Sequence, residues 1–174
     1  MGKVSYREAL ALRWAEVLAD PTLRDLPYKI ELNRFGNIEM SPASTRHARL
    51  QGIIAAQLGR QLGEMGVLTE CAILTDVGVR VPDVAWANAE FFAEFDSTSP
   101  LARAPDLCVE IRSASNSDEE MALKTATYLR AGAIEVWVVG DDGGVLVTDL
   151  SGQQSRSRWP VTLDLPAKVR AEES

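Results

Sequence analysis

Two carboxylates in apolar surroundings are the first candidates for chemistry in this sequence. Asp83 follows a proline in VPDVAW, and Glu110 lies inside the apolar segment PDLCVEI. An aspartate and a glutamate from adjacent strands can converge on one Mg²⁺ or Mn²⁺ ion, because such ions prefer oxygen ligands. A metal held there could generate hydroxide and stabilise the charge that builds on a phosphate. The structural alternative is that Asp83 caps a turn and Glu110 pairs with Arg112, two residues further along the same strand face.

Lys124 is a third candidate because of its place on a predicted helix. The helix over 117–131 carries Met121 and Tyr128 in its apolar stripe, and Lys124 lies three residues after the first and four before the second. Its side chain therefore starts at the edge of the buried face. A lysine in that position can extend its ammonium into a cleft, or it can pack its stem on the helix and remain in solvent.

His47 is the only histidine of the chain. It begins the apolar stripe of a helix predicted over 44–64, in line with Ile54, Leu58 and Met65. The first turn of a helix favours anions, so a histidine there could take part in a site. The alternative is a core histidine enclosed by the apolar side chains of its own helix face.

Helix caps and hydrophobic spacing predict the elements that must position these residues. Ser5 with Glu8 and Ser117 with Glu120 have the spacing of capping boxes. Residues 90–104 read as a short helix and a loop. Helices are predicted over 5–19, 44–64 and 117–131, and strands over 28–33, 38–40, 67–74, 78–81, 84–87, 106–111, 134–139, 145–149 and 159–163.

The connections between these elements predict an α/β (α+β) fold with a central mixed sheet. The Glu110 strand, the helix over 117–131 and the apolar strand IEVWVV should form a right-handed crossover between parallel neighbours. The core then reads αβββαβ, with an N-terminal helix and hairpin and a C-terminal hairpin. We expect one domain over 1–174, with its core at about 28–163 and a frayed polar tail over 167–174.

Composition restricts the class of protein. The net charge of −7 argues against a protein that coats nucleic acid, but it is compatible with an enzyme that meets a phosphodiester at one metal-loaded cleft. Cys71 and Cys108 suggest neither a disulfide framework nor a zinc site, so we expect reduced thiols and a cytoplasmic protein. No apolar run is long enough to cross a membrane.

The ordered set of segments resembles the Uma2 family, a large bacterial family of endonucleases long catalogued as a domain of unknown function, within the restriction-endonuclease-like PD-(D/E)XK superfamily. The segments that carry the resemblance cover roughly 28–159. They are ELNRFGNIEMSP, the helix that opens with His47, VPDVAWA, PDLCVEIRSAS, Lys124 with Tyr128, and AGAIEVWVV.

The resemblance implies a role for each candidate residue. Asp83 matches the aspartate of the "PD" half-motif, and Glu110 matches the acidic residue of the second half-motif. Lys124 matches a lysine that this family supplies from the following helix, and His47 matches a histidine that commonly opens the first core helix. The chain departs from the family at Arg112, where the family usually has an apolar residue.

The activity implied is metal-dependent hydrolysis of DNA by an endonuclease. Asp83, Glu110 and the carbonyl of Ile111 would hold Mg²⁺ or Mn²⁺, and Lys124 would position water. Arg112 either contacts the scissile phosphate, as guanidinium groups do well, or neutralises Glu110 in a decayed site. The basic residues that could touch DNA backbone are Arg34, Arg46, Arg49 and Arg60, although a solvated surface position is the favoured interpretation of each. A homodimer is expected if both strands are cut. The alternative is a catalytically decayed module that binds protein or nucleic acid.

Overall fold

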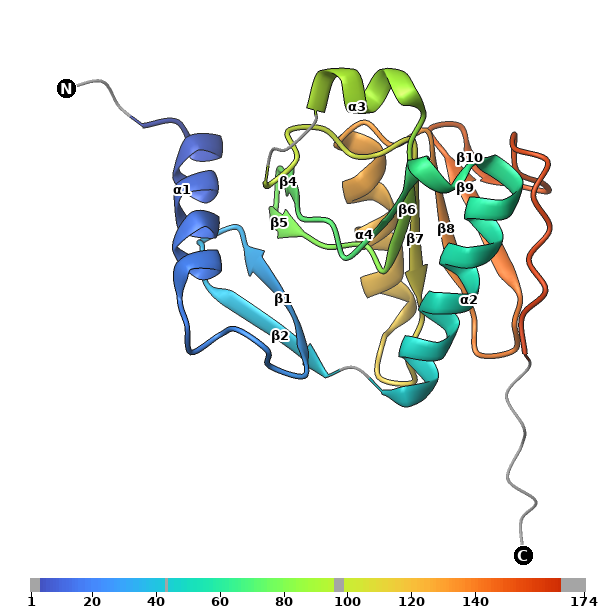
Figure 1. The fold of residues 1–174 in the computed structure, drawn as a ribbon, viewed down its shortest axis with the longest axis horizontal. Helices are drawn as coiled ribbons and strands as arrows, with labels where there is room; N and C mark the ends of the chain where they lie inside the picture. Colours follow the sequence, from blue (N-terminus) through green and yellow to red (C-terminus); the bar gives the residue numbers. More distant parts are fainter. Residues whose placement is uncertain (1–3, 43, 96–98, 167–174) are drawn as a thin grey trace, which may run out of the picture.

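The computed structural model describes residues 4–42, 44–95 and 99–166, and its order of helices and strands follows the sequence-based expectation closely (Figure 1). The elements are α1 (Tyr6–Ala19), β1 (Tyr28–Asn33), β2 (Ile38–Pro42), α2 (Thr45–Leu62), a 3-10 turn η1 (Glu64–Gly66), β3 (Val67–Thr69), β4 (Ile73–Thr75), β5 (Gly78–Arg80), β6 (Val84–Trp86), α3 (Ala89–Phe95), β7 (Leu107–Ile111), α4 (Asp118–Arg130), β8 (Glu135–Val139), β9 (Val145–Asp149) and β10 (Gly152–Gln154). The expected tail over 167–174 lies outside the described residues.

The central sheet has six strands in the order β10-β9-β8-β7-β6-β3. Strands β7 and β8 are parallel neighbours, with Glu110 opposite Val138, and all other pairs in this sheet are antiparallel. Helix α4 makes the crossover between the two parallel strands. The prediction of a parallel pair joined by a capped helix is therefore confirmed, and both predicted capping boxes are present.

The side chains of β7 alternate between the two faces of this sheet, and α2 covers one face while α4 covers the other. Leu107, Val109 and Ile111 of β7 pack with the apolar stripe of α2. Cys108, on the opposite face, packs with Tyr128 of α4. Glu110 follows Cys108 by two residues, so its side chain projects from the same face of the strand, toward α4. The fold thus places a buried carboxylate on β7 against α4, within reach of Lys124 and Tyr128.

A second sheet carries the hairpin in the order β2-β1-β5-β4. The sequence predicted one strand over 67–74, and this was wrong. The chain instead leaves the six-stranded sheet after β3 and joins the four-stranded sheet as β4. Glu70, between them, has a φ of 53°, a left-handed conformation that cannot continue a strand. The switch of sheets matters because it brings β1 and β5 beside the central sheet.

The predicted strand over 159–163 was also wrong. This segment runs along α2 without a strand partner, and side-chain amides bind its backbone. Gln57 binds the N–H and carbonyl of Asp164, and Gln61 binds those of Thr162. The C-terminal hairpin is formed instead by β9 and β10. The two glutamines satisfy the backbone groups that a strand ladder would otherwise have paired.

Met65 does not belong to the buried stripe of α2. The helix ends at Leu62, and Met65 lies in η1 with 92% of its surface exposed. Ile54 and Leu58 are fully buried, as expected. No helix in the described part of the chain is long and apolar enough to span a membrane.

The two thiols are free, and their burial predicts slow chemistry. Burial raises the pKa of Cys71 to about 12 and holds that of Cys108 well above its usual range. Because the thiolate is the reactive form, we expect iodoacetamide to modify neither thiol appreciably in the native protein at pH 7.5. Both should react in guanidinium chloride, as measured by mass spectrometry. Rapid modification of Cys71 without denaturant would contradict the packing described here.

Candidate active site

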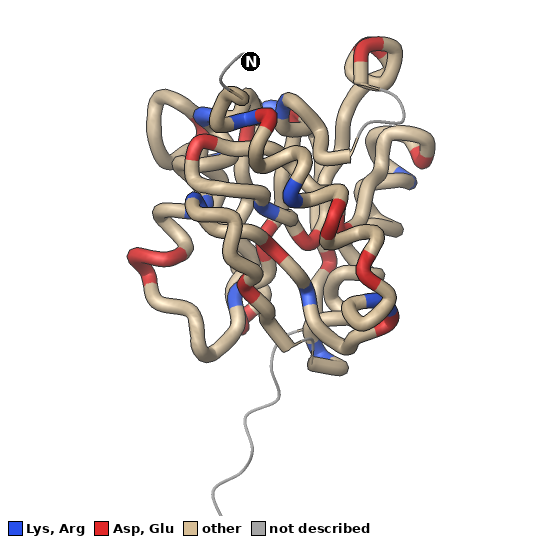
Figure 2. The backbone as a smooth tube through the Cα atoms, turned by 90° about the vertical axis from the view of Figure 1, so that its left-hand side faces the viewer, with Lys and Arg blue, Asp and Glu red and all other residues tan. Residues whose placement is uncertain are grey.

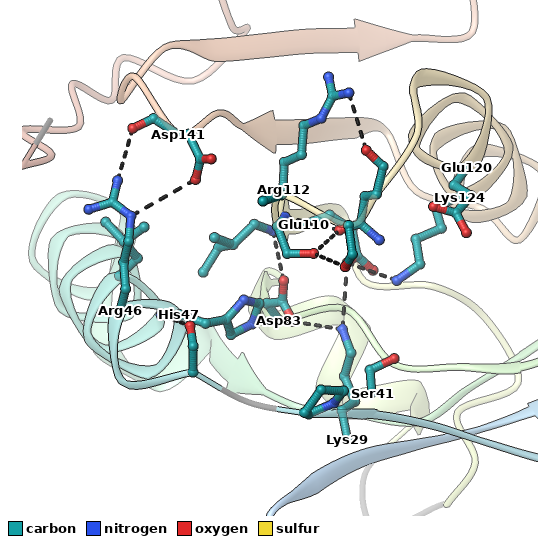
Figure 3. A pocket seen from close by; sticks show the side chains of 18 of the residues that line it. Lys29, Ser41, Arg46, His47, Asp83, Glu110, Arg112, Glu120, Lys124 and Asp141 are labelled. Carbon is teal, nitrogen blue, oxygen red and sulfur yellow. Dashed lines mark hydrogen bonds and ion pairs between the residues drawn. The ribbon is translucent and has the colours of Figure 1, made fainter. Parts of the chain in front are cut away.

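A cleft of about 710 Å³ opens where the hairpin, the start of α2, the start of β6 and the end of β7 meet α4 (Figure 3). Its polar lining includes Lys29, His47, Asp83, Glu110 and Lys124. These residues come from five different elements or their flanking loops. All four principal residues expected from the sequence therefore lie in one cleft.

Asp83 lies directly before β6 and is 1% exposed. Its Oδ1 lies 2.6 Å from Lys29 Nζ and 3.0 Å from His47 Nε2, and its Oδ2 accepts the backbone N–H of Ile111 at 2.7 Å. Burial alone would raise the pKa of Asp83. The hydrogen bond with His47 and the charge of Lys29 outweigh burial and hold the pKa well below its ordinary range. Asp83 is thus a buried, ionised carboxylate rather than a simple turn cap.

Glu110 is 2% exposed and meets three donors. Its Oε1 accepts the hydroxyl of Tyr128 at 2.6 Å, and its Oε2 lies 3.1 Å from Lys124 Nζ and 3.5 Å from Lys29 Nζ. Burial raises the pKa of Glu110, and the charges of Lys29 and Lys124 oppose this shift without cancelling it. The carboxylate is held in one orientation, with Oε2 directed at the ammonium groups in the cleft.

His47 and Lys124 both reach the cleft, as expected from their helix positions. His47 is held at the N terminus of α2, where Ser44 caps the helix by accepting the N–H of His47 at 3.1 Å. The side chains of His47 and Lys124 remain 21% and 22% exposed, respectively. Each therefore touches a buried carboxylate on one side and the open cleft on the other.

Lys29 is the residue of the site that the sequence did not reveal. It lies on β1, and its side chain is only 12% exposed. Burial would lower the pKa of Lys29, but the negative charges of Glu110 and Asp83 raise it above its ordinary value. No signal in the sequence indicates this burial, because Lys29 and Glu31 alternate with Ile30 and Leu32 and so lie on the polar face of the predicted strand.

Glu31 supports the backbone that leads to Asp83. Its Oε1 accepts the N–H of Val81 at 2.8 Å, and its Oε2 lies 3.3 Å from Arg80. Gln51 of α2 donates to the carbonyl of Asp83 at 3.0 Å. The glutamate and the glutamine fix the chain on both sides of the proline, so Asp83 enters the cleft in a defined position.

Arg112 does not pair with Glu110, so that alternative from the sequence was wrong. Its backbone N–H still donates to the carbonyl of Val139 at 2.9 Å, one residue beyond the end of β7. The guanidinium lies 2.6 Å from Asp118 and 3.3 Å from the carbonyl of Asn116, at the start of α4. Arg112 still lines the cleft, and Figure 3 shows it directed away from the carboxylates. It is therefore a group at the cleft margin and not a lock on Glu110.

Of the four arginines considered as DNA contacts, one lines the cleft and three do not. Arg46 lines it and donates to the carbonyl of Asp141 at 2.9 Å. Arg49 and Arg60 are exposed elsewhere on α2, and Arg34 lies 5.5 Å from the ring of Phe35 on the hairpin turn. Arg46 is thus the best placed of the four for a phosphate that enters the cleft.

The donor set is chemically suited to a hard divalent cation. Asp83 and Glu110 both contact the ammonium of Lys29, so one cation already lies between the two carboxylates. Ile111 lines the same cleft and could add its carbonyl. Within the described ranges, no group of three or more His, Cys, Asp or Glu side chains is arranged to hold a metal ion. Two carboxylates and a carbonyl fit Mg²⁺ or Mn²⁺ completed by water, on condition that Lys29 withdraws.

Comparisons with known proteins identify the family and the fold. The model of the Uma2 family, described as "Putative restriction endonuclease", matches residues 14–168. A solved structure described as "a putative nuclease belonging to DUF820 from Anabaena variabilis" is similar with a TM-score of 0.57 and 16% identity, over 69% of this chain and 71% of that one. These likenesses confirm the restriction-endonuclease-like fold expected from the sequence. A search of curated proteins finds no match.

Proposed function

The chain belongs to the Uma2 family, and from that premise we propose that it is a metal-dependent endonuclease that hydrolyses phosphodiester bonds of DNA. The observation that carries the proposal is the convergence of two nearly fully buried carboxylates, Asp83 and Glu110, on one cation in an open cleft. Buried acidic residues with opposed pKa shifts are typical of catalytic sites. A purely structural ion pair would not require the cleft.

Asp83, Glu110 and the carbonyl of Ile111 would hold Mg²⁺ or Mn²⁺. When bound, such an ion supplies an activated water and neutralises charge that develops on the phosphate. The protein contributes the orientation of these ligands. Tyr128 fixes one oxygen of Glu110, and the N–H of Ile111 fixes one oxygen of Asp83.

Lys124 and His47 act at the side of the cleft that faces the substrate. Lys124 is anchored by Glu110 and can donate to a phosphate oxygen or to the attacking water. His47 is anchored by Asp83 and supports the same charged centre. The oxygen of a water forms a bond to phosphorus while the bond to the leaving oxygen breaks in line with it. The water gives a proton to solvent, the leaving oxygen takes one up from solvent, and the cationic groups stabilise the negative charge that develops on the phosphate oxygens.

Surface charge favours contact with DNA at the cleft rather than over a broad face. The chain carries 25 acidic and 18 basic residues. In the view of Figure 2, the basic residues are interspersed with acidic ones along the chain. Long-range attraction of DNA should therefore be weak, and binding should depend on the ion and on the few cleft cations.

The test is cleavage of supercoiled plasmid, duplex DNA and RNA by the purified protein in Mn²⁺, Mg²⁺ or EDTA. We expect nicked and linear DNA with the divalent ions and none with EDTA. The rival function is a decayed nuclease fold that only binds nucleic acid or protein. DNA retained in a gel shift but uncut across Mn²⁺ concentrations would favour that rival.

Cleavage of both strands by one kind of site is simplest in a symmetric dimer. We include a homodimer in the proposal for this reason. Light scattering coupled to size exclusion would show a mass near 38 kDa, about twice the 19.0 kDa of the chain.

Arg112 is expected to assist the substrate and not the metal. Replacing it by leucine removes a guanidinium from the cleft margin but leaves both carboxylates untouched. We expect the cleavage rate in Mn²⁺ to fall about tenfold, which corresponds to about 1.4 kcal/mol, with little change in Mn²⁺ affinity. Arg49→Leu, on the exposed face of α2, is the control and should cleave normally. Faster cleavage and tighter Mn²⁺ binding by Arg112→Leu would show that the arginine is inhibitory.

A further inference from the structure

We propose that Lys29 is the resting counter-ion of the site: its ammonium occupies the place of the divalent metal and must be displaced when the metal binds. This inference rests on the proposed function and adds a step to it. Lys29 Nζ lies 2.6 Å from Asp83 Oδ1 and 3.5 Å from Glu110 Oε2. It is the lysine that contacts both carboxylates, whereas Lys124 contacts Glu110.

Charge balance supports a displaceable cation. In their ionised forms, Asp83 and Glu110 carry two negative charges, and Lys29 and Lys124 carry two positive charges. The cluster is therefore neutral without any metal, apart from His47. A buried carboxylate without a partner is costly, so the ammonium stabilises the fold while no metal is bound. Addition of a divalent ion beside both lysines would place excess positive charge in a buried site, and this excess is relieved when one ammonium leaves.

The surroundings of Lys29 provide a route for its departure. The lysine lines the open cleft together with Met40, Ser41 and Pro42 of β2, all of which are exposed. The flexible side chain can therefore swing from the carboxylates toward the cleft while β1 remains paired. Tyr128 and the N–H of Ile111 continue to hold the carboxylates in place.

The displaced ammonium remains tethered at the cleft wall, where DNA phosphate would enter. One lysine would then neutralise carboxylates in the resting protein and phosphate in the loaded one. Metal and DNA should consequently bind cooperatively, because the anionic substrate gives the displaced lysine a new partner.

The first test is calorimetric titration of Mn²⁺ into the wild type, Lys29→Met and Arg112→Leu without DNA. Lys29→Met should bind Mn²⁺ about 10- to 100-fold more tightly than the wild type, the range in which groups next to a metal site change its affinity. Arg112→Leu removes the same charge from the same cleft and should bind like the wild type. Equal affinities in all three proteins would overturn the inference, as would Lys29→Met that binds no Mn²⁺.

The second test uses the wild type and does not depend on the folding of a variant. Amidination of lysines by ethyl acetimidate, followed by peptide mass spectrometry, reports whether the Lys29 ammonium is accessible. We expect Lys29 to be protected in EDTA and to react at least about fivefold faster in saturating Mn²⁺, because displaced ammonium groups become solvated. Protection that Mn²⁺ leaves unchanged would overturn the inference.

The displacement of Lys29 and the nuclease activity can be tested separately. One outcome is that DNA is cut in Mn²⁺ while Lys29→Met binds Mn²⁺ no more tightly than the wild type and Mn²⁺ leaves Lys29 protected from amidination. In that case the nuclease proposal stands and the displacement of Lys29 is wrong. If Lys29→Met binds Mn²⁺ tightly and Lys29 is released, but no protein form cuts nucleic acid, the displacement stands and the nuclease proposal is wrong.

Discussion

Replacing Asp83 by asparagine is expected to reduce the rate of DNA cleavage at least about 1,000-fold. The change removes the charge that Lys29 and His47 contact and leaves only a neutral amide oxygen for a metal. Loss of one preorganised electrostatic group typically costs 10²- to 10³-fold in rate, and loss of the metal adds to that cost. The measurement is cleavage of a labelled duplex in Mn²⁺ under conditions in which the enzyme is in excess.

A matched control distinguishes catalysis from folding. Asp76 lies on the surface, paired with Arg130 at 2.8 Å, and Asp76→Asn makes the same chemical change outside the cleft. This variant should cleave at the wild-type rate. An Asp83→Asn protein that is folded and still cuts DNA at a comparable rate would remove Asp83 from the catalytic centre.

Asp83→Asn and Glu110→Gln are expected to lower stability by different amounts while both abolish cleavage. Removing one partner of a buried ion pair typically costs 3 to 5 kcal/mol, so Asp83→Asn should lower the free energy of unfolding by about 3 kcal/mol. Glu110→Gln keeps an oxygen for the hydroxyl of Tyr128 and removes a charge whose burial is unfavourable. Because the change also removes the negative charge beside Lys29 and Lys124, we expect its free energy of unfolding to fall, but by less than that of Asp83→Asn, as measured with urea in EDTA.

The pH dependence of unfolding tests independently how Asp83 and Glu110 differ in their contributions to stability. The pKa of Asp83 is lowered in the fold from its ordinary 3.8, so its stabilisation is present above that value and is lost as the pH falls below it. The pKa of Glu110 is raised from 4.5, so its favourable contribution is present below that value and is lost as the pH rises through the higher folded pKa. The wild type should therefore lose stability between pH 4 and pH 2 more steeply than Asp83→Asn. Equal slopes would show that Asp83 is not stabilised as an anion.

Much of the framework could be read from local sequence signals. The capping boxes at Ser5 and Ser117 give the starts of α1 and α4, and the apolar strand after α4 predicts the parallel pair with β7. The site residues with a local signal are Asp83 beside its proline, Glu110 within an apolar strand and His47 at the start of a helix stripe. Their convergence follows from the order of elements and from the handedness of the crossover.

The part that could not be read depends on contacts between distant segments. Lys29 approaches Asp83 because β1 pairs with β5, through Leu32 opposite Val79, and no local pattern reveals that pairing. The direction of Arg112 depends on its contacts with Asp118 and with the carbonyl of Asn116, which the strand pattern does not reveal. Glu70 ended a strand that the apolar pattern of 67–74 favoured, because a left-handed conformation at one residue outweighs weak strand propensity.

The most direct test of the metal-dependent centre is an anomalous difference map from crystals soaked in Mn²⁺. We expect one peak between the carboxylates of Asp83 and Glu110, with oxygen distances of about 2.1 Å and with Lys29 Nζ moved away from both. Crystals in saturating Mn²⁺ that show no peak there, and that retain the ammonium of Lys29 between the two carboxylates, would contradict the account.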